Sequence, residues 1–284
     1  MSLFYVNAEK CSKCGVCATV CPAKIITLND GDALPVASEG ADSLCIKCGH
    51  CVAVCPQGAF SHRDMPTSHC PQVQQEWLFN PDRLEHFLRA RRSIRHFKAE
   101  TVEPGVLCRI MEIACFAPSN HNSQPIYWTA VSGRDEVKKL SGKVADYIRY
   151  LSKKDPAIAR MNYFPQFLVD IEAGKDPICM GAPHIIVAHA PELNSFAQTN
   201  CAIAVTYLEL AAFSFGLGTC WAGFFNRAVQ DWIPLQNSLN IPEEHLCAAS
   251  LLIGYPKYNY HRLTLRNKPR ITWLPLPSSC VDPG

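Results

Sequence analysis

A four-cysteine motif occurs twice near the amino terminus, with the second copy 34 residues after the first. Each copy reads CxxCxxCxxxCP, and a glycine follows the second cysteine in both. The eight cysteines are Cys11, Cys14, Cys17, Cys21, Cys45, Cys48, Cys51 and Cys55. Three closely spaced thiolates with a fourth from elsewhere suit an iron-sulfur cube, whereas zinc ribbons pair two distant CxxC units. The motif therefore predicts two [4Fe-4S] clusters, and its repetition indicates an internal duplication.

The doubled motif is typical of bacterial ferredoxins, and this resemblance implies a crossed arrangement of the ligands. Cys55 would complete the cluster that begins with Cys11, Cys14 and Cys17. Cys21 would complete the other cluster. A small domain of this kind depends on its metal-thiolate bonds, so we expect it to unfold without the clusters.

The chain of 284 residues is too long for a ferredoxin alone, and its 48 % hydrophobic content allows a second core. We expect a ferredoxin-like 2[4Fe-4S] domain over residues 1–65, a linker over 66–80 and a second domain over 81–284. In the second domain we expect helices from Pro81 to near Arg91, over 104–117 and over 196–215. We expect strands over 127–133, 184–190 and 247–254. They alternate irregularly, which favours an α+β domain.

Charge and hydropathy argue against several classes of partner. A net charge of +2 with 18 % charged residues favours neither nucleic acid nor a membrane surface. No leader-like pattern precedes Cys11, and Glu209 interrupts the longest apolar run, so we expect neither secretion nor a membrane span. The other cysteines form no compact framework, and cluster assembly needs reduced thiols, which favours a cytoplasmic location.

Basic residues are dense between positions 89 and 98. They are Arg89, Arg91, Arg92, Arg95, His96 and Lys98. One interpretation is a solvated helix end, where cations interact favourably with the helix dipole. The other is a phosphomonoester site, in which guanidinium groups and the Ser93 hydroxyl bind the phosphate. On this segment alone, both interpretations stay open.

Four motifs in order resemble the nitroreductase family of FMN enzymes, over residues from about 82 to 284. They are RRSIR at 91–95, PSNHNSQP at 118–125, TCWAG at 219–223 and IGYP at 253–256. The resemblance implies a nitroreductase-like α+β domain that binds FMN at the interface of a homodimer. With the amino-terminal motifs, the chain looks like a ferredoxin-nitroreductase fusion.

The resemblance also implies which residues contact the flavin. Arg91, Ser93 and Arg95 would contact its phosphate, ribityl chain and pyrimidine edge, and Arg92 would assist. Residues from the second motif would come from the partner subunit. They are Ser119, Asn122 and Gln124.

Two further sets of FMN contacts are expected near the carboxy terminus. Ala222 and Gly223 would place backbone amides near flavin N5, although many family members carry glutamate in place of Ala222. Arg262 and Arg266 are alternative candidates for a cation that completes the phosphate site.

The polar stretch 134–181 is expected to form a lid, with substrate-contacting residues between 141 and 177.

A flavin can join one-electron clusters to two-electron organic reductions. We therefore predict an FMN-dependent, nitroreductase-like oxidoreductase that passes electrons from the clusters to FMN and on to a small electrophilic acceptor. Nitroaromatics, quinones and activated alkenes fit this description. No side chain is assigned as catalytic, because flavin N5 carries the hydride and solvent can supply protons.

The electron donor and the reaction have alternatives. A GxGxxG turn between a strand and a helix is missing, so we expect reduced ferredoxin or directly docked NAD(P)H as the donor rather than a Rossmann domain. The same architecture could instead carry out reductive dehalogenation or flavin reduction, or act as an electron-transfer or redox-sensing module with FMN as a relay. If the chain bound no FMN, a binding or structural role would remain for the second domain.

Overall fold

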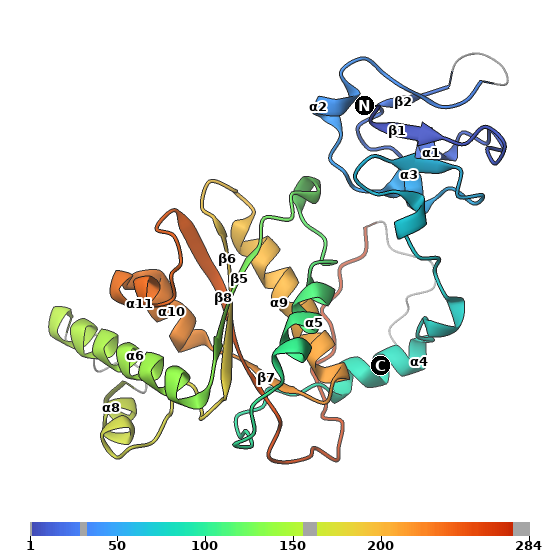
Figure 1. Ribbon diagram of the computed structural model, residues 1–284. Coiled ribbons are helices and arrows are strands. Elements are labelled where there is room, and N and C mark those ends of the chain that lie inside the picture. Colours follow the sequence, from blue (N-terminus) through green and yellow to red (C-terminus); the bar gives the residue numbers. More distant parts are fainter. Residues whose placement is uncertain (1, 29–32, 156–163, 275–284) are drawn as a thin grey trace.

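The computed structural model describes residues 2–28, 33–155 and 164–274. Figure 1 shows a small amino-terminal unit beside a larger unit built around a sheet, with α4 (Pro81–Ala90) at the start of the larger unit. Proline begins α4 at its first turn, and the side chain of Asn80 caps it by accepting from the amide of Arg83.

The small unit has two short antiparallel strand pairs. β1 (Phe4–Val6) pairs with β4 (Phe60–His62), and β2 (Ile26–Thr27) pairs with β3 (Val36–Ala37). Its helices each make about one turn: α1 (Val16–Thr19), α2 (Ala41–Leu44) and α3 (His50–Ala53). Gly15 and Gly49 precede α1 and α3 with φ of 72° and 74°, a conformation that favours glycine. Both motifs therefore need glycine for the same reason, which is the positive φ just before a short helix.

The large unit contains a four-stranded antiparallel sheet in the order β5-β6-β8-β7. The strands are β5 (Tyr127–Ser132), β6 (His184–Pro191), β7 (Gly218–Trp221) and β8 (His245–Gly254). The longer helices are α5 (Pro104–Ala114), α6 (Arg134–Lys154), α8 (Phe164–Glu172), α9 (Ala197–Ser214), α10 (Gly223–Asp231) and α11 (Ile233–Ser238). Three short 3-10 turns, η1 (Thr67–His69), η2 (Gln75–Trp77) and η3 (Asn120–Asn122), lie in connecting segments.

Helices cover both faces of the sheet (Figure 1). Along β6, Ile185 and Val187 belong to the core that includes α6, α10 and α11, whereas Ile186 and Ala188 belong to the core that includes α5 and α9. Side chains alternate between the faces of a strand, so a strand buried on both faces needs a continuous apolar sequence. This explains the apolar run of β6.

The predicted α+β class is confirmed, and the expected helices and strands occur with ends shifted by a few residues. Two elements differ from expectation. β7 was not anticipated, and the first part of the stretch 134–181, for which no single long helix was expected, forms one continuous helix of 21 residues over 134–154. The domain limits at 65 and 80 remain predictions. Within the residues that the structure describes, no helix is both long enough and apolar enough to cross a membrane.

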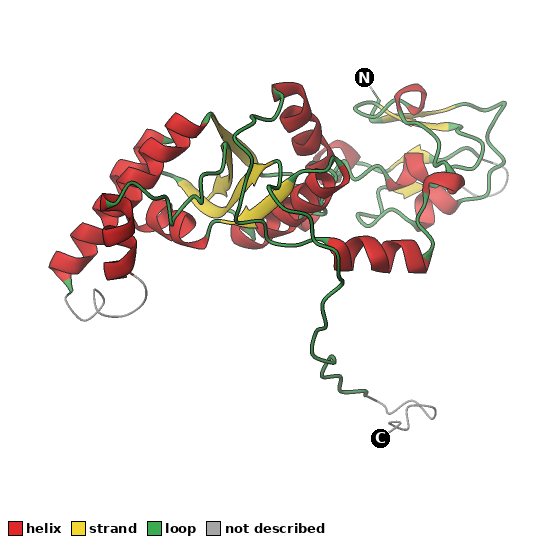
Figure 2. Cartoon of the chain, turned by 90° about the horizontal axis from the view of Figure 1, so that it is seen from below, coloured by secondary structure: helices red, strands yellow, loops and turns green. Residues whose placement is uncertain are grey.

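Much of the segment before α4 and the carboxy-terminal tail is exposed. Residues 68–86 are all exposed, including Trp77 at 79 %. After β8 the chain extends away from the body of the molecule, as Figure 2 shows, with Leu265 at 88 % and Trp273 at 47 % exposure. Both segments present apolar side chains that the single chain does not cover.

Candidate cofactor sites

The eight cysteines of the doubled motif line two separate cavities of the small unit. One cavity is lined by Cys11, Cys14, Cys17 and Cys55. The other is lined by Cys21, Cys45, Cys48 and Cys51. Each set thus combines three cysteines of one motif with the fourth of the other, which is the crossed arrangement that the ferredoxin resemblance implies.

The donors around these cavities fit iron-sulfur clusters. Each cavity brings together four cysteines, and four thiolates are the ligand set of a [4Fe-4S] cluster. Backbone N–H groups donate to two of the sulfurs: Ala59 to Cys55 Sγ at 3.2 Å and Lys47 to Cys45 Sγ at 3.4 Å. Burial raises the pKa of the Cys51 thiol to about 11, so a bound cation would be needed to keep it ionised.

In the large unit, Arg91 is held by a buried carboxylate. Its Nη1 lies 3.1 Å from Oε1 of Glu209 on α9, and the Thr219 hydroxyl donates to the same oxygen at 3.0 Å. One Nη1 contact leaves the other four N–H donors of a guanidinium for a further anion. Glu209 therefore holds Arg91 in a fixed position, which favours an anion-binding role for this segment over a solvated helix end.

Arg92 and Arg266 meet at one hydroxyl group. Nη1 of Arg92 donates to Oγ1 of Thr264 at 2.8 Å, and Nη1 of Arg266 donates to the same atom at 3.0 Å. Arg92 also lies 6.0 Å from the ring centroid of Tyr260. Arg262 and Arg266 are both exposed in the tail. Of the two tail candidates, Arg266 is the one that the structure brings to the RRSIR segment.

The RRSIR segment runs alongside β7. Ser93 forms a parallel bridge with Thr219, and the Ile94 amide donates to the Thr219 carbonyl at 2.7 Å. A Cβ on Gly218 would lie 2.5 Å from Cγ1 of Ile94, so only glycine permits this approach. Close packing of Ile94 on Gly218 fixes where the flanking arginines lie.

Arg91 and Arg95 line different cavities. Arg91 and Arg92 border a cavity of about 470 Å³ that also includes Thr219 and Tyr260. Arg95 borders a mainly apolar cavity of about 700 Å³. The other residues around the larger cavity come from β7, α10, α6, α8 and the segment before β6: Val144, Tyr147, Ile148, Leu151, Phe164, Phe167, Pro177, Ile178, Met180, Cys220, Trp221, Ala222, Gly223, Phe224, Arg227 and Asp231.

The backbone amides of Ala222 and Gly223 differ in their bonding. The Ala222 amide donates to the carbonyl of Ser250 at 2.8 Å. Gly223 begins α10, and the first N–H groups of a helix have no acceptor within the helix. Gly223 is therefore the better placed of the two to offer an amide to a ligand in the cavity.

One edge of the large cavity is polar. The Tyr147 hydroxyl donates to Asp231 at 2.8 Å, and Arg227 is paired with the same carboxylate oxygen. Burial, followed by the bond to Asp231, raises the pKa of Tyr147 to about 12. Burial also raises the pKa of the Cys220 thiol, which is typical of a small buried cysteine and not of a reactive thiolate.

Ser119, Asn122 and Gln124 lie in the loop between α5 and β5. The Ser119 hydroxyl accepts from the Gln124 amide at 3.0 Å. Asn122 Nδ2 donates to backbone carbonyls of the small unit in the same chain, as detailed below. Their role as flavin contacts from a partner subunit stays a prediction.

Sequence reasoning missed Glu209, Gly218 and Thr264. Glu209 was visible as a lone charge within an apolar run, which indicates a buried acid with a partner. Gly218 and Thr264 carried no comparable signal, because their roles depend on contacts with distant residues.

The chain matches two family descriptions. Residues 88–255, more than half of the chain, match the nitroreductase family, and residues 10–60 match the 4Fe-4S dicluster domain. An Archaeoglobus fulgidus protein named provisionally as an NADH dehydrogenase/NAD(P)H nitroreductase is 26 % identical over 171 residues, which cover 59 % of this chain and 82 % of that protein. The 5,6-dimethylbenzimidazole synthase of Rhodospirillum rubrum is 26 % identical over 193 residues, which cover 63 % of this chain and 86 % of that one.

A solved structure shares the fold of the large unit. It is a nitroreductase with bound FMN from Desulfitobacterium hafniense DCB-2, with a TM-score of 0.55, 23 % identity and coverage of 69 % of this chain and 99 % of that one. The ferredoxin-nitroreductase organisation expected from the motifs is confirmed by the two family matches. This chain belongs to the nitroreductase family and carries a 4Fe-4S dicluster domain ahead of its nitroreductase domain.

Proposed function

We propose that this chain is an iron-sulfur flavoprotein oxidoreductase in which electrons pass from two [4Fe-4S] clusters to FMN and on to a small electrophilic acceptor. The observation that carries the proposal is the combination of two four-cysteine cavities with a 700 Å³ apolar cavity in one chain of the nitroreductase family. Bound FMN supplies a ring that takes up single electrons and passes on pairs.

The chain offers a charged site and an apolar site for the two ends of FMN. Arg91, Arg92 and Arg266 would provide the charge-assisted hydrogen bonds that a phosphate needs. Arg95 and the Gly223 amide would lie at the edge of the ring, where donors stabilise added negative charge. Ser93 lies between Arg91 and Arg95 and is paired with Thr219, which borders the smaller cavity.

The lining of the large cavity favours a planar, apolar acceptor. Phe224 contacts the rings of Phe164 and Phe167 edge to face, with centroids 5.8 and 5.0 Å apart. Aromatic walls pack well against flat rings and exclude water. Arg95 would favour acceptors that gain negative charge on reduction, such as nitroaromatics and quinones.

A homodimer would cover the exposed apolar segments. Trp77, Leu78 and Phe79 precede α4, and Leu265 and Ile271 lie in the extended tail. Contiguous exposed apolar surface commonly marks a protein interface. The dimer would also allow Ser119 and Gln124 to reach a partner's flavin, whereas the amide nitrogen of Asn122 is bonded to the small unit of its own chain. Light scattering of the holoprotein should give twice the chain mass.

Anaerobic stopped-flow measurements on the holoprotein test the electron path. Iron, sulfide and FMN are quantified first, and flavin reduction is then followed with NADH, NADPH and reduced ferredoxin. A C14S/C48S variant lacking clusters should lose reduction by ferredoxin. Fast reduction of its flavin by NADH would show that the clusters are not the entry route. A panel of nitroaromatic, quinone, activated-alkene and halogenated aromatic acceptors then defines the reaction, and a holoprotein without FMN would end the proposal.

A further inference from the structure

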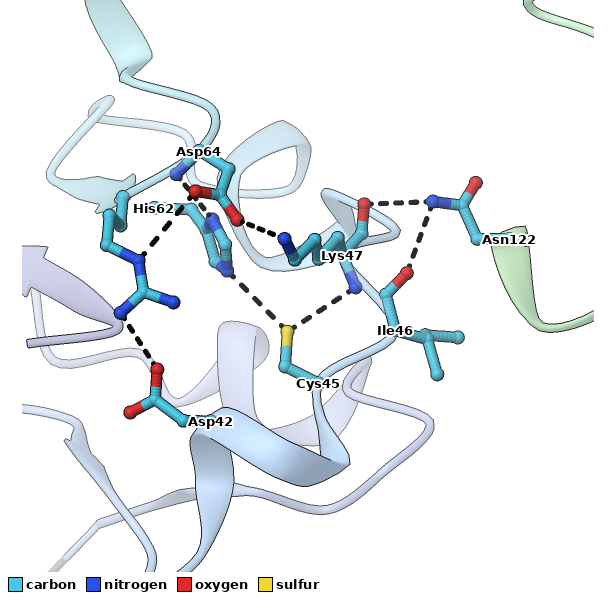
Figure 3. A network of polar contacts seen from close by, with 8 residues as sticks. Asp42, Cys45, Ile46, Lys47, His62, Asp64 and Asn122 are labelled. Atoms are coloured by element: carbon cyan, nitrogen blue, oxygen red, sulfur yellow. Dashed lines mark hydrogen bonds and ion pairs between the residues drawn. The ribbon is translucent and has the colours of Figure 1, made fainter. Parts of the chain in front are cut away.

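The two units make contact at the loop that carries Cys45 and Cys48. Nδ2 of Asn122 donates to the carbonyl of Ile46 at 3.2 Å and to the carbonyl of Lys47 at 3.0 Å, as Figure 3 shows. Ile46 and Lys47 are the two residues between these cysteines. The nitroreductase domain therefore holds one of the two cysteine loops by its backbone.

The loop that presents Asn122 has an unusual backbone. His121, Asn122 and Gln124 have φ of 48°, 52° and 44°, the left-handed region in which asparagine is tolerated better than most residues. Strained residues persist where surrounding contacts fix them. Asn200 on α9 supplies such contacts, because its side chain bonds both the Asn120 amide and the Asn120 side chain. Asn122 is thus presented from a firmly held loop.

The cysteine loop of the first motif is more open to solvent. Ser12, Lys13 and Cys14 are all exposed, whereas at the matching positions Ile46 and Cys48 are half-buried and Lys47 is exposed. The duplicated motif therefore has two inequivalent copies. The first can meet an external protein, and the second faces the nitroreductase domain.

His62 adds a donor to the second copy. The Asp64 amide donates to Nδ1 of His62 at 3.0 Å, so Nδ1 carries no proton and the ring proton lies on Nε2. Nε2 lies 3.5 Å from Sγ of Cys45, so this N–H points at the sulfur (Figure 3). The 34-residue register places Leu28, which has no donor, at the matching position of the first copy.

Hydrogen bonds to ligand sulfurs raise the reduction potential of a cluster. Cys45 accepts from the Lys47 amide and the His62 ring, and in the other site Cys55 accepts from the Ala59 amide and Cys14 from the Val16 amide and the Ser12 side chain. The His62 ring should therefore raise the potential of the site containing Cys45 above the value that this site would have without the ring. The order of electron flow follows from position, because the exposed site can meet a carrier protein and the site containing Cys45 meets the nitroreductase domain.

We propose that the site of Cys21, Cys45, Cys48 and Cys51 delivers electrons to the nitroreductase domain, with Asn122 as its docking residue and His62 as the residue that raises its potential. The proposal rests on the proposed function above. With clusters bound, a low-potential one-electron carrier protein would lose one electron to the exposed site, and the same electron would pass to the site containing Cys45. Two such transfers would supply the pair that the organic acceptor takes up with protons from solvent.

Hydrogen exchange of the holoprotein tests the docking contact. N122A removes both bonds to the cysteine loop, so amides of residues 46–49 should exchange about tenfold faster. Amides of residues 12–15 serve as the internal reference and should not change. N237A, at an exposed asparagine of α11, is the matched control. Equal exchange at residues 46–49 in N122A and the native protein would overturn the docking role.

Potentiometric titration followed by electron paramagnetic resonance tests the role of His62. H62L copies the residue found at position 28 and should lower one midpoint potential while leaving the other unchanged. H62Q retains an N–H donor and should restore most of the shift. H69L, at an exposed histidine outside the cluster sites, should change neither potential. Unchanged potentials in an H62L protein with full iron content would overturn this role, as would an equal shift of both.

The FMN, iron and sulfide content of the purified protein separates failure of this proposal from failure of the proposed function. A purified protein that lacks FMN or clusters contradicts the proposed function itself. A protein with full FMN, iron and sulfide that shows no change in N122A exchange or H62L potentials contradicts the roles of Asn122 and His62 and leaves the proposed function standing.

Discussion

The carboxylate of Glu209 anchors Arg91: its Oε1 lies 3.1 Å from Nη1 of Arg91 in the interior of the large unit. Glu209 is buried, and its carboxylate also accepts from Thr219 of β7. A buried carboxylate needs such partners to stay charged. The pair therefore links α9, β7 and the RRSIR segment at the point where a phosphate site is proposed.

E209Q tests this link. It preserves the shape of the side chain but removes the charge that pairs with Arg91, so we expect the unfolding free energy to fall by about 1–3 kcal/mol. Chemical denaturation of the protein without added FMN measures the change. E112Q breaks the exposed pair of Arg109 and Glu112 and should cost less than about 0.5 kcal/mol. Equal effects of the two variants would contradict a structural role for Glu209.

G218A tests the packing that fixes the RRSIR segment. The added Cβ would lie 2.5 Å from Ile94, so the segment must shift, and we expect a loss of about 1–3 kcal/mol together with weaker FMN retention. Thermal unfolding and dialysis against FMN-free buffer measure both effects. G105A is the matched control, because no atom lies within 4 Å of its added Cβ and alanine favours a helix.

Stability should fall as pH decreases from about 6.5 to 4. Burial, followed by His245, lowers the pKa of His189 from 6.5 to about 4. Thr129 and Tyr127 are its other neighbours. Between these pH values the unfolded chain binds a proton that the folded chain does not, so the unfolding free energy falls by up to about 3 kcal/mol.

Denaturation curves at several pH values check this dependence. H189Q removes the titrating ring, and the slope of stability against pH between 4 and 6.5 should become smaller. T129V removes a hydrogen-bond partner of His189 but keeps the imidazole ring. It should therefore change the unfolding free energy at every pH and leave its slope against pH the same. Identical slopes in H189Q and the native protein would contradict the assignment.

C55S tests the crossed arrangement of the cysteines. Although Cys55 belongs to the second motif, it lines the cavity of Cys11, Cys14 and Cys17. We expect C55S to lose that cluster and to keep the other, so that iron content falls from about eight to about four atoms per chain. Iron analysis and electron paramagnetic resonance measure the loss. C70S, at an exposed cysteine outside both cavities, should retain all the iron.

The cluster sites were predictable because their ligands are encoded by local spacing and duplication. The proposed roles of the two sites were not predictable. They depend on Asn122 meeting residues 46 and 47, which lie far away in sequence, and on a tautomer of His62 that the Asp64 amide sets.

The proposed FMN site was also predictable only in part. The motif at 91–95 indicates its proposed cations, and the apolar sequences of β6, α9 and β8 indicate the core beneath them. β7 escaped detection because its four residues are too few for a period to show. The choice between Arg262 and Arg266 depends on Thr264 meeting Arg92, a contact that no local pattern encodes.

R266Q and R262Q separate the two tail candidates. Both arginines are exposed, and Arg266 is the one that shares the Thr264 hydroxyl with Arg92. If Arg266 completes the phosphate site, R266Q should weaken FMN binding about tenfold, which corresponds to one charge-assisted hydrogen bond of about 1.4 kcal/mol. Riboflavin lacks the phosphate, so its affinity should be the same in R266Q and the native protein. R262Q should leave both affinities unchanged, and a larger loss of FMN affinity in R262Q than in R266Q would reverse the assignment.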